Sequence, residues 1–231
     1  DGLLVPGVGA YAACYRLALF MTLFATAFRM GIEPFFFSHA KEKNAPQTYA
    51  TITRYFVIFG ALILVLVTIF SDLLKLLLIR DSSYWEAMIV VPIILAANFF
   101  LGIYHNLSVW YKVSDRTKFA GYISLFGAAV TLILNFWLIP YYSYVGSAIA
   151  TLAAYGSMML LSFYFGRKYY PIPYDLKRIG GYLLISLSFS GIYFYLFRNN
   201  YYLGSILILI FFALIYYAEK DELKLLLKKS S

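Results

Sequence analysis

Charged side chains are scarce in this sequence, and their scarcity excludes a soluble globular domain. Lys, Arg, Asp and Glu make up 13% of the 231 residues, about half of the roughly 25% that is usual in soluble proteins. Hydrophobic residues make up 62%. A chain of this length cannot bury so much apolar surface in its own core, so lipid must solvate much of it. Membrane topology then explains the net charge of +8, and no nucleic-acid partner is expected.

Residues that carry metal, redox or nucleophilic chemistry are also few. The chain has one cysteine, Cys14, and two histidines, so it has no intrachain disulfide and no Cys/His cluster with the spacing of a metal site. The sequence contains no phosphate-binding loop and no pairing of a nucleophile with a base. We therefore expect no cofactor and no enzymatic activity.

Long apolar segments dominate what is present. Seven of them are long enough to cross the roughly 30 Å hydrocarbon core of a bilayer. They cover residues 8–40, 52–70, 88–111, 119–139, 144–166, 179–197 and 201–218. The sequence therefore predicts an all-α fold, a polytopic transmembrane bundle of about seven helices over residues 1–218, followed by a basic tail over 219–231. The linker over residues 72–86 has the pattern of an amphipathic helix lying at the membrane interface.

Basic residues fall almost entirely on alternate linkers. Fourteen lysines and arginines belong to one set of linkers, and three belong to the other. The larger set is Lys41, Lys43, Arg54, Lys112, Arg116, Lys118, Arg167, Lys168, Lys177, Arg178, Lys220, Lys224, Lys228 and Lys229, and the smaller is Lys75, Arg80 and Arg198. The positive-inside rule places the larger set in the cytoplasm. We therefore expect a cytoplasmic C-terminus and a first residue on the opposite side.

Three ionisable residues lie within the first apolar segment, where insertion of a charge costs about 2.5–3.5 kcal/mol. Arg29 and Glu33 are one helical turn apart and can form a salt bridge. Arg16 can extend its guanidinium to the outer interface. In the alternative interpretation, both arginines face a hydrated cavity and bind an anionic substrate, because the guanidinium fork matches phosphate oxygens.

Polar residues also interrupt the third apolar segment. Asn98 and His105 are seven residues apart and lie near one helix face, with Gly102 between them, and Asn106 is adjacent. His105 could titrate near neutral pH. We interpret it instead as a hydrogen-bonding residue of a cavity.

Small residues recur every four positions in the fifth apolar segment. Gly146, Ala150 and Ala154 share one face of the predicted helix. Small side chains at this spacing let two helix backbones approach closely in lipid. We expect this face to pack, and Ile149 and Leu160 to face lipid.

Three stretches resemble a known family. Residues 15–44, YRLALFMTLFATAFRMGIEPFFFSHAKEKN, combine a helix with embedded arginines, the sequence E-P-F-F and a basic turn. Residues 135–155, NFWLIPYYSYVGSAIATLAAY, contain N-x-x-L-I-P, a short turn and V-G-S-A-x-A-T. Together with residues 84–112, they resemble the C-terminal half of bacterial polysaccharide-biosynthesis flippases of the MOP exporter superfamily, of the Wzx or O-antigen translocase type.

The resemblance implies a 14-helix transporter, of which this chain would supply the last seven helices and a missing N-terminal half the others. Such proteins lie in the bacterial inner membrane and move undecaprenyl-pyrophosphate-linked oligosaccharide, an O-antigen or other polysaccharide repeat unit, between leaflets by alternating access. Glu33 would hold Arg29 in place between cycles. The residues expected to bind the lipid-linked oligosaccharide are Arg16, Arg29, Glu33, Asn98, His105 and Asn106.

Two other functions remain open. A cation-coupled multidrug or small-molecule exporter of the same superfamily would favour acidic residues within the membrane, whereas the spans here carry two arginines against Glu33. A membrane-embedded glycan polymerase or ligase would be expected to have a large external loop with polar catalytic residues, and the external linkers here are short.

Overall fold

In the computed structural model, the backbone is described for residues 6–79 and 82–230, and side chains for residues 9, 11–12, 14–79 and 84–220. The described chain is helical and contains no strand, which confirms the predicted all-α fold. The elements in chain order are α1 (Pro6–Ser38), α2 (Ala45–Ile69), α3 (Ser71–Leu78), the 3-10 helix η1 (Ser82–Val90), α4 (Val91–Leu107), α5 (Val109–Val113), α6 (Lys118–Tyr169), α7 (Leu176–Leu196) and α8 (Tyr201–Ser230).

Six helical stretches in the described part of the chain are long and apolar enough to cross a membrane. They are Cys14–Ser38, Ala45–Ile69, Tyr84–Val113, Lys118–Tyr169, Leu176–Leu196 and Tyr201–Lys220. The fourth is 52 residues long and contains two of the seven predicted apolar segments. The structure therefore has six such stretches where the sequence predicts seven, because α6 contains two of the predicted segments.

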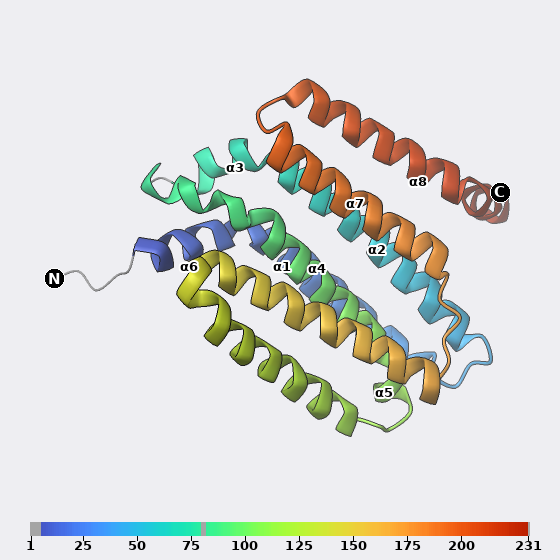
Figure 1. Cartoon of the computed structure of the whole chain (residues 1–231). Coiled ribbons are helices and arrows are strands. Elements are labelled where there is room, and N and C mark those ends of the chain that lie inside the picture. Colours follow the sequence, from blue (N-terminus) through green and yellow to red (C-terminus); the bar gives the residue numbers. More distant parts are fainter. Residues whose placement is uncertain (1–5, 80–81, 231) are drawn as a thin grey trace.

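A reversal of α6 near Ser143 separates these two segments. Ser143 adopts φ 48° and ψ −129°, which is not helical, and Pro140 shortly before it has no backbone N–H to donate. The chain folds back there, and the two arms of α6 lie side by side (Figure 1). Gly146 in the second arm lies so close to Leu138 in the first that a Cβ would come within 2.7 Å of the Leu138 backbone. The small residue at 146 permits this contact.

Helix α4 occupies the centre of the bundle because its sequence is mostly apolar and most of its side chains are buried. It packs against α1, α2 and α6, while α2 also packs against α7 (Figure 1). Gly102 lets α4 approach its neighbours, since a Cβ there would lie 2.5 Å from Phe56 and 3.1 Å from Ala25. By contrast, the first arm of α6 and most of α8 expose large apolar side chains, as lipid-facing helices do.

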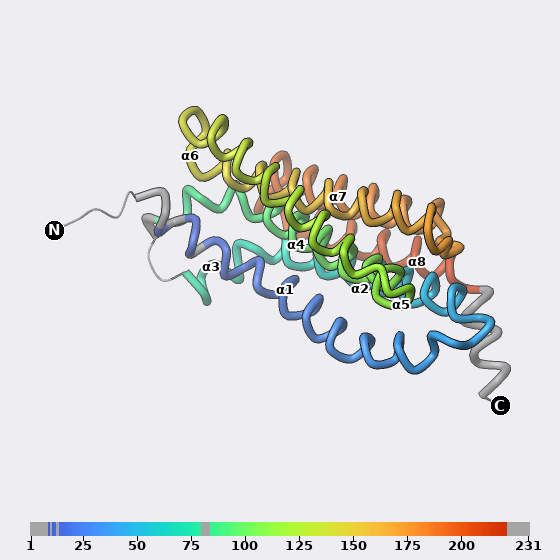
Figure 2. Tube along the Cα trace, turned by 90° about the horizontal axis from the view of Figure 1, so that it is seen from below, coloured from blue at the N-terminus to red at the C-terminus, as the bar shows by residue number. Residues whose placement is uncertain are grey.

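The linkers alternate between the two ends of the bundle. The α1–α2, α5–α6 and α6–α7 linkers lie at one end, and α3, the Ser143 reversal and the α7–α8 turn lie at the other (Figure 1). Figure 2 shows α1 running the length of the bundle, so that it ends near the start of α2. The basic linkers grouped by sequence are thus grouped in space as well.

Helix α3 agrees with the predicted amphipathic segment. Its leucines Leu73, Leu76 and Leu77 are exposed, whereas Asp72 is buried against cationic partners. Residues 80 and 81 of that linker lie outside the described part of the chain.

Candidate anion-binding seam between two helices

Helices α1 and α4 enclose a small polar cavity of about 70 Å³. From α1 come Thr22, Thr26 and Arg29, which recur at helical spacing and so share one face. From α4 come Asn98 and His105, on either side of Gly102 as the sequence predicted. The lack of a side chain at Gly102 brings the two helices together at the cavity, so the polar groups of both helices converge.

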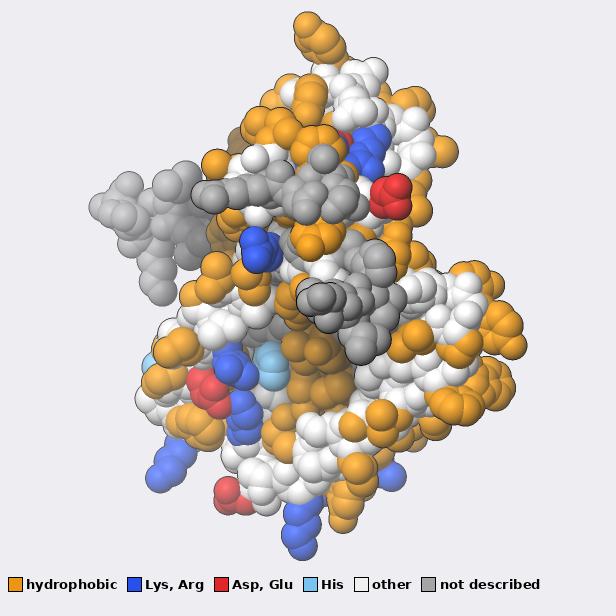
Figure 3. Space-filling view, turned by 90° about the vertical axis from the view of Figure 1, so that its left-hand side faces the viewer, with side chains coloured by type: hydrophobic (Ala, Val, Ile, Leu, Met, Phe, Trp, Pro, Cys, Tyr) orange, Lys and Arg blue, Asp and Glu red, His pale blue; other side chains and the backbone are white. Residues whose placement is uncertain are grey.

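A second, smaller pocket continues this cavity toward α5. Arg29 and His105 line both pockets, and Glu33, Asn106 and Lys112 line the second. We call the two pockets together the polar seam. Figure 3 shows a histidine and side chains of both charges gathered beside a hollow on one face of the molecule. The structure thus brings five of the six predicted site residues together.

Arg16 is the residue that the structure does not bring to the seam. Its Nη1 donates to the carbonyl oxygen of Leu78 at 3.4 Å, and its side chain is exposed. Leu78 is the last residue of α3, where carbonyl groups have no partner within the helix. Thirteen residues of helix separate Arg16 from Arg29, which corresponds to roughly 20 Å. Arg16 therefore caps α3 and lies away from the seam, and its role in substrate binding stays a prediction.

Glu33 has a different partner from the one expected. Its Oε1 accepts from Nζ of Lys112 at 2.5 Å, and the side chains of Lys112 and Glu33 are 26% and 36% exposed. The predicted salt bridge between Arg29 and Glu33 is therefore corrected. Tertiary packing explains the difference, because α5 places Lys112 against α1 beside Glu33. Sequence spacing identifies neighbours within α1 but not across helices.

Arg29 consequently keeps an available guanidinium. Among the side chains that the structure describes, no carboxylate forms an ion pair with Arg29. Glu33 pairs with Lys112 instead. Its side chain is half-buried and reaches both pockets of the seam. Counting Arg29, Lys112 and Glu33, the seam carries one excess positive charge. An anion is the ligand that this charge favours.

The two asparagines add polar groups without partners. Nδ2 of Asn98 and Oδ1 of Asn106 are buried and have no hydrogen-bond partner among the described residues. Nδ2 of Asn106 donates to the Gly102 carbonyl at 3.0 Å, which fixes the orientation of that amide. A buried polar atom without a partner costs about 1–3 kcal/mol. Asn98 lines the first pocket of the seam and Asn106 the second, so both unpartnered amides belong to residues of the seam.

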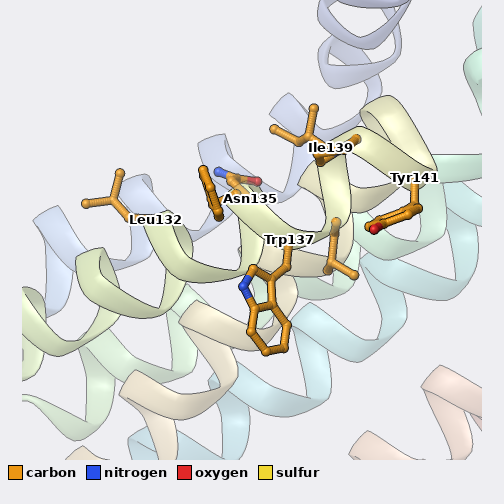
Figure 4. A pocket seen from close by; sticks show the side chains of 8 residues that line it. Leu132, Asn135, Trp137, Ile139 and Tyr141 are labelled. Carbon is orange, nitrogen blue, oxygen red and sulfur yellow. The ribbon is translucent and has the colours of Figure 1, made fainter.

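A larger hollow lies elsewhere and has a different character. It has a volume of about 970 Å³ and is lined only by residues 132 and 135–141 of the first arm of α6 (Figure 4). Trp137 and Tyr141 project from it and are mostly exposed. It contains no charged side chain and is open along one helix. We interpret it as a lipid-facing recess and not as the site.

Sequence reasoning missed several residues that interact across helices. Lys112 was counted as a linker charge, although it lies one residue beyond an apolar segment and within reach of α1. Arg54 was also counted with the linker charges, although it falls within the predicted segment over residues 52–70; it is buried within α2 and pairs with Glu219 of α8 at 3.8 Å.

The model of the MatE family matches residues 6–137, which is more than half of the chain and includes both helices of the polar seam. No curated protein matches the chain. No solved structure matches it either.

Proposed function

Since the chain belongs to the MatE family of the MOP exporter superfamily, whose members are membrane transporters, we propose that it is part of a flippase for a polyprenyl-pyrophosphate-linked oligosaccharide. The family and the apolar helices make it a multi-pass membrane protein with a transport function. We further propose that the protein lies in the bacterial inner membrane and that the basic end of the bundle faces the cytoplasm.

The available guanidinium of Arg29 is the observation that carries this proposal. A charge within a membrane span is costly unless a partner or a hydrated cavity compensates it. The described part of the seam provides no carboxylate for Arg29. Guanidinium binds phosphate oxygens through two parallel N–H donors. Asn98, His105 and Asn106 supply further polar groups, so the seam suits a pyrophosphate better than a neutral or cationic ligand.

The size of the cavity defines the role of this chain. Ligand pockets usually have volumes of about 300–1,000 Å³, whereas the larger pocket of the seam has about 70 Å³. A glycan does not fit in it. We propose that the seam is one wall of a larger cavity and that a second helical bundle, the expected N-terminal half, supplies the other. Rocking of one bundle against the other would then expose the wall to each leaflet in turn.

A cation-coupled exporter of cationic compounds is the alternative, and the seam gives it less support. Among the residues that line the two pockets of the seam, only Glu33 is acidic, and it pairs with Lys112. A cationic substrate would therefore meet net positive charge.

Complementation of a flippase-deficient bacterial strain by the complete transporter, with both bundles present, tests the proposal. Arg29→Ala should abolish export of surface polysaccharide at normal membrane abundance, and Arg29→Lys should restore part of it, because a point charge remains without the bidentate fork. Arg16→Ala is the matched control, since it removes an arginine of the same helix outside the seam. Normal export by Arg29→Ala would overturn the proposal.

A further inference from the structure

One carboxylate in the seam has two possible cationic partners. Arg29 precedes Glu33 by four residues on α1, so the two side chains can meet on one helix face. Lys112 reaches Glu33 from α5 and forms the observed ion pair. All three side chains line the same pocket. Whether Glu33 pairs with Lys112 or with Arg29 determines whether the Arg29 guanidinium is available to a ligand.

Packing holds Lys112 in position for this pair. The three residues before it, Val109, Trp110 and Tyr111, are buried. Trp110 donates from Nε1 to Oγ of Ser162 at 3.3 Å, which ties α5 to the second arm of α6. Trp110 and Ser162, which do not line the seam, therefore help to fix the backbone at Lys112. Removing the ammonium group alone should leave this packing unchanged.

We infer that Lys112 is a positioning residue that keeps Arg29 available for an anionic ligand by holding Glu33 away from it. This inference rests on the proposed function, since it concerns the same pyrophosphate-binding wall. Without the ammonium group, Arg29 is the other cation that lines this pocket, four residues before Glu33 on α1. A salt bridge between them would occupy the guanidinium and place a negative charge beside the ligand. Lys112 thus acts on the ligand through Glu33 and Arg29 and does not itself contact the ligand.

The inference predicts an unusual pattern of single and double variants. Lys112→Gln should weaken anion binding, because Glu33 then competes for Arg29. If that salt bridge is formed nine-tenths of the time, the apparent affinity falls by about tenfold. In the double variant Glu33→Gln, Lys112→Gln, the competitor is also removed, and binding should return. Glu33→Gln alone should bind at least as tightly as the wild-type protein, because no carboxylate remains to compete.

Binding of farnesyl pyrophosphate to the detergent-solubilised protein, measured by calorimetry, tests these expectations. Lys112→Arg should retain affinity near that of the wild type, because arginine also pairs with Glu33. Size-exclusion profiles of each variant report folding. The double variant lacks the same ammonium group as Lys112→Gln, so its restored binding would show that the single variant is not simply misfolded.

The outcomes separate this inference from the proposed function. If Lys112 contacts the ligand directly, the double variant stays as weak as Lys112→Gln, and the inference is overturned. If the ion pair has only a structural role, Glu33→Gln loses as much binding as Lys112→Gln, which also overturns it. In both cases, loss of binding in Arg29→Ala would leave the proposed function standing. If Arg29→Ala binds as tightly as the wild type, the proposed function itself fails.

Discussion

Arg198 and Asp72, 126 residues apart, form a bidentate ion pair that ties the α7–α8 turn to α3. Nε of Arg198 donates to Oδ2 of Asp72 at 2.8 Å, and Nη2 donates to Oδ1 at 2.7 Å. Lys75 also pairs with Oδ1 at 2.5 Å. The carboxylate is nearly buried, whereas Arg198 remains partly exposed. The pair joins the amphipathic segment to the last two helices at the less basic end of the bundle.

Asp72→Asn should therefore destabilise the protein in a pH-dependent way. Burial raises the pKa of Asp72, but hydrogen bonds from Arg198 and Lys75 outweigh it, so the pKa lies below its ordinary value of 3.8. A carboxylate whose pKa is lower in the folded than in the unfolded protein stabilises the fold at pH values above its unfolded-state pKa. This stabilisation is lost as the pH falls through its folded-state pKa. At neutral pH the loss should be about 2 kcal/mol.

Thermal unfolding in detergent checks this expectation. The difference between wild type and Asp72→Asn should be full at pH 7 and should shrink once the pH falls below 3.8, the ordinary pKa of the aspartate. Asp115→Asn is the control, since Asp115 is exposed and Asn tolerates its φ of 53°. A difference that stays constant across pH would contradict a charge-based role for Asp72.

Glu219 should anchor α8 to the bundle. Tyr182 of α7 donates its hydroxyl hydrogen to Oε1 of Glu219 at 2.6 Å. Nη1 of Arg178 lies 3.3 Å from Oε2 of Glu219, and Nη2 of Arg54 lies 3.8 Å from it. The side chain of Glu219 is 5% exposed. Glu219→Gln removes the carboxylate that the buried Arg54 and the partly exposed Arg178 share, which should cost about 3 kcal/mol. Tyr182→Phe removes one hydrogen bond and should cost about 1–2 kcal/mol.

Protease sensitivity and thermal unfolding in detergent measure both changes. Tyr202→Phe is the matched control for the tyrosine, because Tyr202 is 87% exposed on α8. Equal stability of Tyr182→Phe and Tyr202→Phe would show that the hydrogen bond to Glu219 does not hold α8.

A single methyl group should distinguish two glycines of α6. At Gly146 a Cβ would lie 2.7 Å from backbone atoms of Leu138, whereas at Gly121 nothing lies within 4 Å. Gly146→Ala should therefore lower stability by about 1–3 kcal/mol through overpacking. Gly121→Ala should be neutral or stabilising by up to about 1 kcal/mol, because Ala favours the helix. Equal effects on thermal stability and membrane abundance would contradict the close packing of the two arms.

The contrast between these glycines illustrates what the sequence could predict. Periodicity identified the face of Gly146, Ala150 and Ala154, and all three are buried. The exposed positions Ile149 and Leu160 on the same arm were also predicted correctly. Period and composition determine which face of a helix avoids lipid, so such features follow from local sequence.

Partners between helices could not be predicted in the same way. The pairs of Glu33 with Lys112 and of Arg54 with Glu219 depend on how distant helices pack, and spacing along one helix carries no such information. Helix starts were missed for a different reason. Helix α2 begins at Ala45, before the apolar segment predicted from residue 52, because its first turn contains Pro46 and polar residues that an apolar run does not include.

Accessibility of two engineered cysteines should establish which end of the bundle faces the cytoplasm. Ser143 is exposed at the reversal of α6, and Thr117 is exposed just before the first arm begins, so the two residues lie at opposite ends of that arm. The positive-inside rule places the basic α5–α6 linker in the cytoplasm. Ser143→Cys should therefore react with a membrane-impermeant maleimide in intact cells, and Thr117→Cys only after permeabilisation. The native Cys14 is fully buried and should contribute little background. Labelling of both positions from outside would show that the first arm of α6 does not cross the membrane, and the reverse pattern would invert the whole topology.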